Sequence, residues 1–327
     1  MCESVRTLTA VFLDYANLYA EDLDRQPLEK AFRHISWHAD TPQSLLVERL
    51  QDADVAIVSD ISLNAAIFAA LPALKLVLVA STGTDSIDLA AANHHGVTVC
   101  HCRDYATWSL AQHAFALLLT LTNNTIRYDR LIGEGAWQQA NAFCLPCFPL
   151  NQLAGKTLGI VGYGASGQRM AIMAKAFGMQ VKVAALQGRP AATDRIELES
   201  LLPQVDVLSL HCALSDETRN LLDARRLAMM KPEALLINVA RGAIVDALAL
   251  AEALRAGHLA GAGLDVLHCE PPPDDHPLLQ HDIPNLLITP HISWSSRPAR
   301  QEILNQLAEN AQAFAAGQPR RTVTSST

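Results

Sequence analysis

The sequence predicts an α/β protein built from two doubly wound parallel-sheet domains. Short apolar runs rich in Val, Ile and Leu alternate with helical patterns along nearly the whole chain, which is typical of parallel sheets covered by helices on both faces. The length of 327 residues favours two domains over one. A Gly-rich loop joins a predicted strand to a predicted helix at residue 162, the turn at which a second series of strands and helices begins.

The first third of the chain supplies one of the two predicted sheets. Its strands are expected at 10–13, 55–59, 74–80 and 97–100, with helices at 42–51 and 63–71. From 108 to 132 the sequence is rich in Ala and Leu with polar residues on one stripe, which predicts one long helix.

The second sheet is predicted downstream of residue 155. Six strands are expected, at 157–161, 181–184, 205–210, 234–239, 261–267 and 286–288. They complete a doubly wound domain, so the last predicted helix, 298–315, has no place in it and is expected to return to the first domain. We therefore predict a discontinuous first domain, 1–104 with 292–327, and a second domain at 105–291.

Composition excludes several classes of protein. The net charge is −8 and the pI about 5.8, which argues against a nucleic-acid partner because phosphate backbones require a basic face. No apolar stretch approaches the roughly 20 residues that span a bilayer, and residues 1–6 show no apolar core of a signal peptide, so a cytoplasmic location is expected. Cys144 and Cys147 form an isolated C-x-x-C pair without a second pair, so we expect free thiols and no metal site.

The Gly-rich loop carries the first functional signal. Gly162, Gly164 and Gly167 follow a strand and open a helix, the context that a dinucleotide site requires. In that pattern the first glycine permits the tight turn, the second lets the backbone approach a pyrophosphate and the third lets the helix pack closely. Ala165 and Ser166 complete the predicted phosphate contacts. This second domain is thus expected to be a Rossmann domain that binds NAD or NADP.

The choice between NAD and NADP is left open by the end of the second strand. Ala185 stands where such domains usually carry an acidic residue for the ribose hydroxyls, and Arg189 is either a partner for a 2′-phosphate or an exposed loop residue. The remaining predicted cofactor contacts follow or end later strands, and they are His211, Val239 and Asp265. Packing is favoured over chemistry for His211, and Asp265 either accepts from the nicotinamide carboxamide or caps a loop.

Three residues after later strands suit the reduction of a 2-keto acid. Arg241 can hold a carboxylate with two parallel hydrogen bonds. His291, after Thr289-Pro290, is the side chain best suited to proton transfer near neutral pH. Glu270 is expected to favour the charged imidazole as its neighbour. We assign no chemistry to the other histidines, His113 among them.

A second anion site is predicted in the first domain. Ser81, Thr82 and Gly83 follow the strand at 74–80 and precede a helix, so their backbone N–H groups are suited to a small anion such as a substrate carboxylate. The alternative is an ordinary turn between a strand and a helix.

At this point the chain resembles a known family, the D-isomer-specific 2-hydroxyacid dehydrogenases, over nearly its whole length. The resemblance is carried by Gly155 through Gly164, Met230-Lys231-Pro232 through Asp246, Asp265 through Pro271 and Thr289-Pro290-His291. Within the family the chain is most similar to glycerate dehydrogenases, also called hydroxypyruvate reductases, on segments such as Thr82 to Asp85 and Arg103-Asp104-Tyr105.

The resemblance implies Arg241, Glu270 and His291 as catalytic residues and the segment near 81–83 as the substrate carboxylate site. It also implies a flavodoxin-like substrate domain and a homodimer formed through the helix near 108–131. The expected reaction is NAD(P)-dependent interconversion of hydroxypyruvate or glyoxylate with D-glycerate or glycolate, a change at the CH–OH group of the donor. Two alternatives remain: a nucleotide-sensing, co-repressor-like binding protein, and a dehydrogenase of a larger or phosphorylated D-2-hydroxy acid.

Overall fold

The computed structural model describes residues 7–186, 194–280 and 283–324. The chain forms two compact units, one of Met1–Ala106 with Ser295–Thr327 and the other of Thr107–Trp294. None of the described helices combines the length and the apolar character that a membrane-crossing segment needs.

The first unit is built on a five-stranded parallel sheet in the order β2-β1-β3-β4-β5, which is the flavodoxin-like order expected. The strands are β1 (Thr9–Phe12), β2 (His34–Trp37), β3 (Val55–Val58), β4 (Leu76–Val79) and β5 (Thr98–His101). Strand β2 was not predicted, because its sequence His-Ile-Ser-Trp carries little apolar signal. It lies at the edge of the sheet, where its residues are exposed or half-buried.

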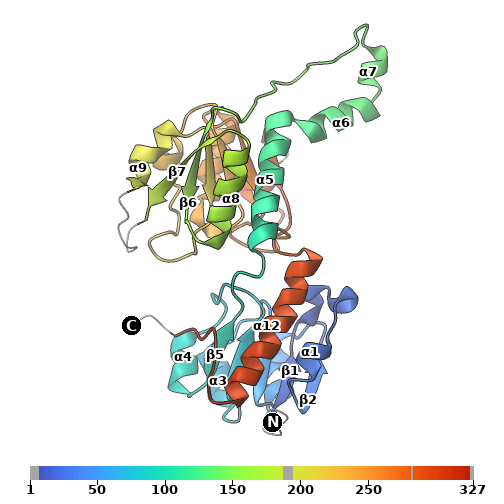
Figure 1. Cartoon of the computed structure of the whole chain (residues 1–327), viewed down its shortest axis with the longest axis vertical. Helices are drawn as coiled ribbons and strands as arrows, with labels where there is room; N and C mark the ends of the chain where they lie inside the picture. The colour runs from blue at the N-terminus through green and yellow to red at the C-terminus, as the bar shows by residue number, and fades with distance from the viewer. Residues whose placement is uncertain (1–6, 187–193, 281–282, 325–327) are drawn as a thin grey trace. The chain divides into compact units, whose positions relative to one another are not determined.

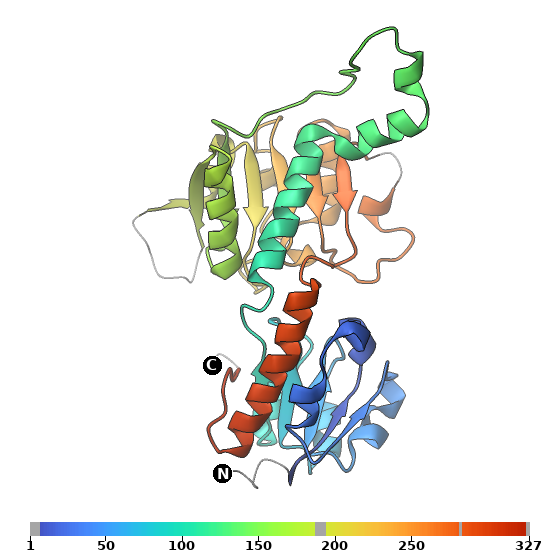
Figure 2. The ribbon, with the colours of Figure 1, turned by 45° about the vertical axis from the view of Figure 1, so that its right-hand side comes forward.

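Helices cover both faces of this sheet. The helices α1 (Gln26–Glu29) and α12 (Arg297–Ala315) pack together on one face, and Figure 2 shows α12 running along that face. The opposite face carries α2 (Leu46–Leu50), α3 (Ala65–Ala70) and α4 (Leu89–His94). The C-terminal helix therefore belongs to the unit that the N-terminal strands form.

The second unit is built on a seven-stranded parallel sheet in the order β12-β11-β10-β9-β6-β7-β8. Its strands are β6 (Thr157–Val161), β7 (Gln180–Ala185), β8 (Arg195–Glu197), β9 (Val207–Leu210), β10 (Leu235–Asn238), β11 (Gly261–Leu264) and β12 (Leu286–Ile288). The six predicted strands are present, and β8 is an additional edge strand. The chain order reverses between β6 and β9, and this switch point is where ligands bind in such sheets.

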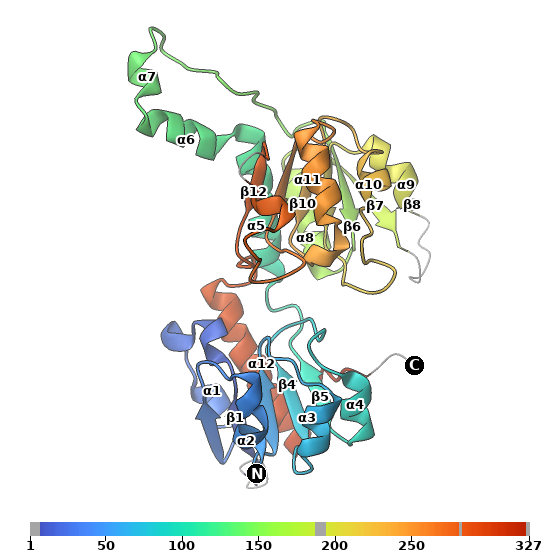
Figure 3. The ribbon, with the colours of Figure 1, turned by 180° about the vertical axis from the view of Figure 1, so that it is seen from behind.

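The seven-stranded sheet is also covered on both faces. The helices α5 (Thr107–Asn123) and α8 (Ala165–Ala176) lie on one face, as Figures 1 and 2 show. The other face carries α9 (Leu198–Leu201), α10 (Ala224–Leu227) and α11 (Ala247–Arg255), which lie in front of the sheet in Figure 3. A Cβ atom at Gly263 would lie 2.9 Å from the Leu117 Cβ, so glycine lets α5 pack closely on β11.

The prediction of one helix over 108–132 is wrong. The chain instead forms α5, then α6 (Thr125–Gly133) and α7 (Ala136–Gln139). Asn124 interrupts them in the left-handed conformation with φ 52°, which asparagine tolerates better than most residues. Its Nδ2 donates to the carbonyl of Pro149 at 2.8 Å, and this bond ties the break to the segment that returns from α7.

Candidate active site

The carboxyl end of β10 positions Arg241. Asn238, the last residue of the strand, is 1% exposed, and its amide shapes the next turn from inside. Its Oδ1 accepts from the Ala240 N–H at 3.0 Å and its Nδ2 donates to the Arg241 carbonyl at 2.9 Å. The main chain of Arg241 is therefore fixed by a buried side chain rather than by the strand alone.

Gly242 joins this turn to the one that carries Glu270. A Cβ atom at Gly242 would lie 1.9 Å from the carbonyl carbon of Leu267 and 2.3 Å from the nitrogen of His268. These neighbours are backbone atoms, which cannot rotate away as a flexible side chain can. The absence of a side chain at Gly242 is thus what lets the Arg241 turn touch the Leu267–Glu270 turn.

Glu270 and His291 form a direct hydrogen bond. His291 Nδ1 lies 2.6 Å from Glu270 Oε2, and the other carboxylate oxygen accepts from the Leu267 N–H at 2.7 Å. Because an ionised carboxylate only accepts, the imidazole carries its proton on Nδ1 and Nε2 is the ring nitrogen left for other chemistry. The two side chains are 34% and 39% exposed respectively, so a small molecule can reach the pair.

The charge on Glu270 is favoured by its surroundings. Burial raises the pKa of Glu270, but the hydrogen bond and charge of His291, the Leu267 N–H and the charge of Arg241 together lower it below its usual value. Glu270 is therefore ionised throughout the neutral range. Its negative charge lies 2.6 Å from the Nδ1 of His291.

The turn that carries His291 is organised by Asp265. His291 has a left-handed backbone with φ 53°, which is uncommon for a residue with a side chain. The Asp265 carbonyl accepts from the His291 N–H at 2.8 Å. Its fully buried carboxylate accepts from the N–H groups of Ile292 and Ser293 at 3.0 and 2.8 Å. Three consecutive backbone donors thus converge on one residue and hold the turn.

These bonds are those of a loop cap, one of the two roles expected for Asp265. Its Oδ1 also accepts from the Thr289 hydroxyl at 2.6 Å, and the residue is 0% exposed. His113 on α5 completes the cluster, with Nε2 at 2.8 Å from Thr289 Oγ1 and 3.5 Å from Asp265 Oδ1. Sequence reasoning missed His113 because a single polar residue on an apolar helix gives no sign of its partner.

The Gly-rich loop has the geometry that a dinucleotide requires. Gly162 has φ 92°, and a Cβ atom there would lie 2.4 Å from the Cys212 nitrogen. A Cβ atom at Gly167 would lie 2.2 Å from the Gly162 carbonyl oxygen, whereas one at Gly164 would meet nothing within 4 Å. Gly162 and Gly167 therefore permit close packing, whereas Gly164 faces open space before the first turn of α8. No side chain caps that helix N-terminus, which leaves its N–H groups for a phosphate.

Ser166 and His211 lie together at this loop. Ala165 and Ser166 begin α8, and Ser166 Oγ is 3.2 Å from His211 Nδ1. Burial lowers the pKa of His211 to about 4, so this imidazole is neutral and bridges Ser166 and Ser209 as a packed residue. Val239 is buried just after β10. Arg189 lies outside the described residues.

The predicted anion loop of the first unit follows β4. The N–H groups of Thr82, Gly83 and Thr84 donate to no acceptor within 7–186, 194–280 and 283–324. The Ser81 hydroxyl donates to the Gly83 carbonyl at 2.7 Å, which holds the loop curved. Free backbone donors of this kind, on an exposed Thr82 and half-buried Gly83 and Thr84, are what a small carboxylate requires.

Comparison with known proteins agrees with this geometry. Residues 115–293 match the family model of the NAD binding domain of D-isomer specific 2-hydroxyacid dehydrogenases. The chain is 41% identical to a glycerate dehydrogenase of Methylorubrum extorquens over 323 residues, 97% of this chain and 99% of that protein. It is 33% identical to a hydroxypyruvate reductase of Blautia hydrogenotrophica over 94% of this chain and 97% of that one.

A solved structure covers the whole fold. An NADPH-dependent glyoxylate/hydroxypyruvate reductase of Sinorhizobium meliloti, in complex with NADP and malonate, superposes with a TM-score of 0.82. It is 27% identical and covers 97% of this chain and 96% of its own. The present chain belongs to the D-isomer specific 2-hydroxyacid dehydrogenases. It is an NAD(P)-dependent oxidoreductase that interconverts a 2-keto acid and a 2-hydroxy acid.

The contact at Gly242 can be tested by adding one methyl group. Gly242→Ala is expected to lower kcat/KM about 100-fold, the usual effect of a displacement of about 1 Å in a catalytic site, because the Arg241 and Glu270 turns must separate. Gly133→Ala is the matched control, since a Cβ atom there meets nothing within 4 Å. Steady-state kinetics with circular dichroism check the result, and a folded Gly242→Ala enzyme with normal kcat/KM would show that the contact is dispensable.

Proposed function

We propose that the enzyme reduces hydroxypyruvate or glyoxylate to D-glycerate or glycolate with NADH or NADPH, and catalyses the reverse reaction. The observation that carries the proposal is the 2.6 Å hydrogen bond between His291 Nδ1 and Glu270 Oε2, formed where the Arg241 charge also acts on Glu270. The identities of the relatives support this choice of substrates, because they are named glycerate dehydrogenase, hydroxypyruvate reductase and glyoxylate reductase.

His291 is the proposed proton donor in the reduction. A nicotinamide cofactor held at the Gly-rich loop would supply the hydride for the keto carbon, and His291 Nε2 is the proposed source of the proton for the keto oxygen. Glu270 stays ionised and holds the imidazolium through Nδ1. In the oxidation the same Nε2 accepts the hydroxyl proton while the hydride leaves the carbon. Arg241 is proposed to hold the substrate carboxylate and to stabilise the charge that develops on the neighbouring oxygen.

The two units are proposed to divide the work. The unit with the Gly-rich loop is proposed to bind the cofactor through Gly162, Gly164, Ala165, Ser166 and Gly167. The close packing at Gly162 and Gly167 and the open space at Gly164 support this assignment. The other unit contributes Ser81, Thr82 and Gly83 to the substrate carboxylate. Ala185 offers no carboxylate to exclude a 2′-phosphate, so both cofactors are retained in the proposal and parallel assays with NADH and NADPH decide between them.

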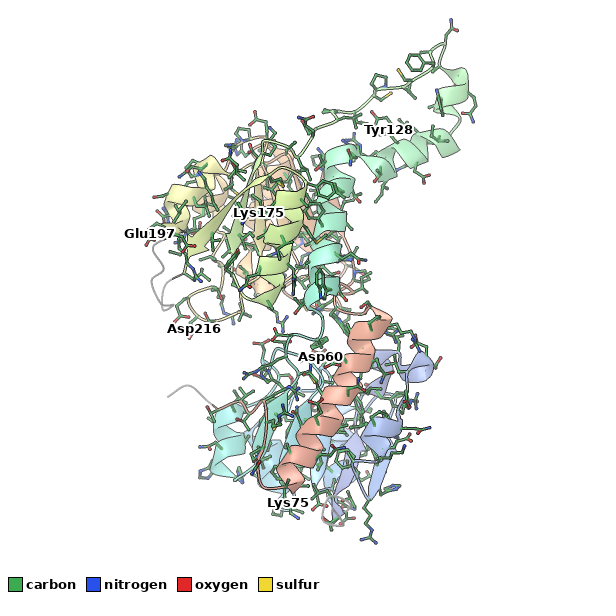
Figure 4. The ribbon with its side chains drawn as sticks, viewed as in Figure 1. Asp60, Lys75, Tyr128, Lys175, Glu197 and Asp216 are labelled. Carbon is green, nitrogen blue, oxygen red and sulfur yellow. The ribbon has the colours of Figure 1, made fainter. Side chains whose placement is uncertain are left out.

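We further propose that the protein is a homodimer through the arm formed by α6, α7 and the segment returning to residue 150. Tyr128 ties α6 to this returning segment, since its hydroxyl accepts from the Phe148 N–H at 3.0 Å, and Figure 4 shows Tyr128 beside both. Figures 1 and 3 show the arm projecting from the rest of its unit.

The apolar side chains of this arm argue for a second copy of the chain as its partner. Phe143 is 90% exposed, and the other exposed large apolar residues of the arm are Ile126, Ile132, Trp137 and Leu150. Clusters of this kind commonly mark protein interfaces. The cytoplasmic location and the lack of nucleic-acid or membrane partners stay predictions from the sequence.

His291→Ala is expected to lower kcat for reduction by about two to four powers of ten, the range for loss of a general acid. Cofactor binding, measured by fluorescence titration with NADH or NADPH, should change little, because the Gly-rich loop is untouched. Near-normal turnover in the variant would remove His291 from the mechanism. Inactivity of the unmodified enzyme on every 2-keto acid, despite cofactor binding, would instead favour a binding protein.

Glu270→Gln is expected to shift the alkaline limb of the reduction rate to lower pH. The reason is that a neutral amide removes the negative charge that Glu270 places 2.6 Å from the imidazole, and a carboxylate favours the charged form of a neighbouring imidazole. The measurement is kcat as a function of pH for both proteins. An unshifted limb with reduced kcat would mean that Glu270 orients the ring without tuning its charge.

Replacing Phe143 and Trp137 together by Asp is expected to yield monomers, because two charges would have to be desolvated in the interface. Light scattering coupled to size-exclusion chromatography checks the mass. Tyr19→Asp is the matched control, since this aromatic residue is 71% exposed but lies in the other unit. An unchanged mass of the double variant, whether monomeric or dimeric, would contradict the arm as the dimer contact.

A further inference from the structure

A fixed arginine stands beside the anion loop of the first unit. Arg103 follows β5, next to β4 in the sheet, so the segments after both strands meet at the carboxyl edge. The Cys102 N–H donates to the Ser81 carbonyl at 3.0 Å, which ties the two segments directly. Figure 4 labels Asp60 at this edge and Lys75 at the opposite one.

The main chain around Arg103 is held by buried amides of α12. Gln306, 5% exposed, accepts from the Arg103 N–H through Oε1 and donates to the Arg103 carbonyl through Nε2, each at 2.9 Å. Asn310, fully buried, donates to the His101 carbonyl at 3.0 Å. Buried amides are costly unless fully hydrogen-bonded, and here they are used to fix one short loop segment.

The side chain of Arg103 is fixed as well. His101, 9% exposed, lies between Arg103 and the anion loop. Its Nδ1 donates to the Thr82 carbonyl at 2.7 Å, and its Nε2 accepts from Arg103 Nε at 2.6 Å. Burial, with the charges of Arg103 and Arg321, lowers the pKa of His101 despite the Thr82 carbonyl. The ring is therefore neutral, as accepting from a guanidinium requires.

The outer nitrogens of this guanidinium are unused. Within the described part of the chain, the Nη groups of Arg103 form no hydrogen bond and no ion pair, and the residue is exposed. By contrast, Arg300 in the same unit pairs with Asp22 through both Nη groups, at 2.8 and 3.0 Å. Arg103 is thus a cation whose side chain is held in place while its two Nη groups are left to donate. The ring of His101 separates its guanidinium from the Thr82 carbonyl.

We propose that Arg103 recognises a hydrogen-bond acceptor on C3 of the substrate, such as the hydroxyl of hydroxypyruvate. The proposal rests on the function proposed above, in which the loop N–H groups hold the substrate carboxylate. Arg103 lies beside that loop, joined to the Thr82 carbonyl through His101. The carboxylate carbon and C3 are both bonded to C2 of the substrate, so a polar group on C3 can reach a donor beside the loop, whereas pyruvate and glyoxylate carry no polar group there.

The physical consequence is selectivity. A site that places a donor against a substrate hydroxyl disfavours the analogue that lacks it, because the donor then loses water without gaining a partner. Pyruvate has the carbon skeleton of hydroxypyruvate with a methyl group in place of the hydroxymethyl group. Glyoxylate lacks C3 altogether and so leaves room for water at Arg103.

The test is kcat/KM for hydroxypyruvate, pyruvate and glyoxylate with native enzyme and Arg103→Met. The native enzyme should prefer hydroxypyruvate to pyruvate by at least about 10-fold. Arg103→Met should lower the hydroxypyruvate value about 10- to 100-fold, as for loss of a hydrogen bond to a charged group, and leave the other two within about threefold. Arg103→Lys, which keeps a charge but lacks the planar fork, should lie between.

Arg33→Met is the matched control. Arg33 is exposed and precedes β2 at the opposite edge of the same sheet, so all three substrates should react as with native enzyme. Equal losses for the three substrates in Arg103→Met would overturn the proposal, since Arg103 would then serve the shared carboxylate or the fold. Unchanged kinetics, or a native enzyme without preference for hydroxypyruvate, would overturn it too. Failure of the proposed function looks different: the native enzyme would reduce none of the three.

Discussion

The active site depends on the fully buried carboxylate of Asp265. A charge in that position is tolerable only when hydrogen bonds replace the lost water, and the donors it finds are the N–H groups of Ile292 and Ser293 and the Thr289 hydroxyl. Meeting that requirement folds the chain after β12 into the turn in which His291 takes φ 53°. The orientation of His291 is therefore set by the burial of another residue.

Buried polar side chains also hold other loops that follow strands. Asn238 shapes the Arg241 turn, and Gln306 with Asn310 holds the segment of His101 and Arg103. In the first unit the buried Asp14 carboxylate accepts from the N–H groups of Ser59 and Asp60, both at 2.8 Å. Irregular backbone at the carboxyl edge of a parallel sheet has no ladder partner, so buried polar side chains satisfy it instead.

Much of this arrangement was open to prediction. Apolar runs in the sequence indicate buried strands. The three glycines of the nucleotide loop could be interpreted as well, because every dinucleotide site of this kind makes the same demands on its local backbone. The edge strands β2 and β8 were not predicted, because half-exposed strands carry a mixed pattern of polar and apolar residues. The break between the helices at Asn124 was not predicted, because it involves a hydrogen bond to the Pro149 carbonyl, 25 residues away in the sequence. For Asp265 a cofactor contact and a loop cap were both left open, since a strand-end acid gives no local sign of how deeply it is buried.

The sequence by itself determined the buried strands of both sheets, the Gly-rich turn and the choice of Arg241, Glu270 and His291 as candidates on chemical grounds. Each of these is encoded within a few neighbouring positions, where apolar periodicity and side-chain chemistry act directly. The tertiary structure alone decided that Gly242 touches Leu267, that Asp265 and His113 support His291, and that His101 fixes Arg103. Those contacts join residues that lie far apart in the sequence, so only tertiary packing brings them together.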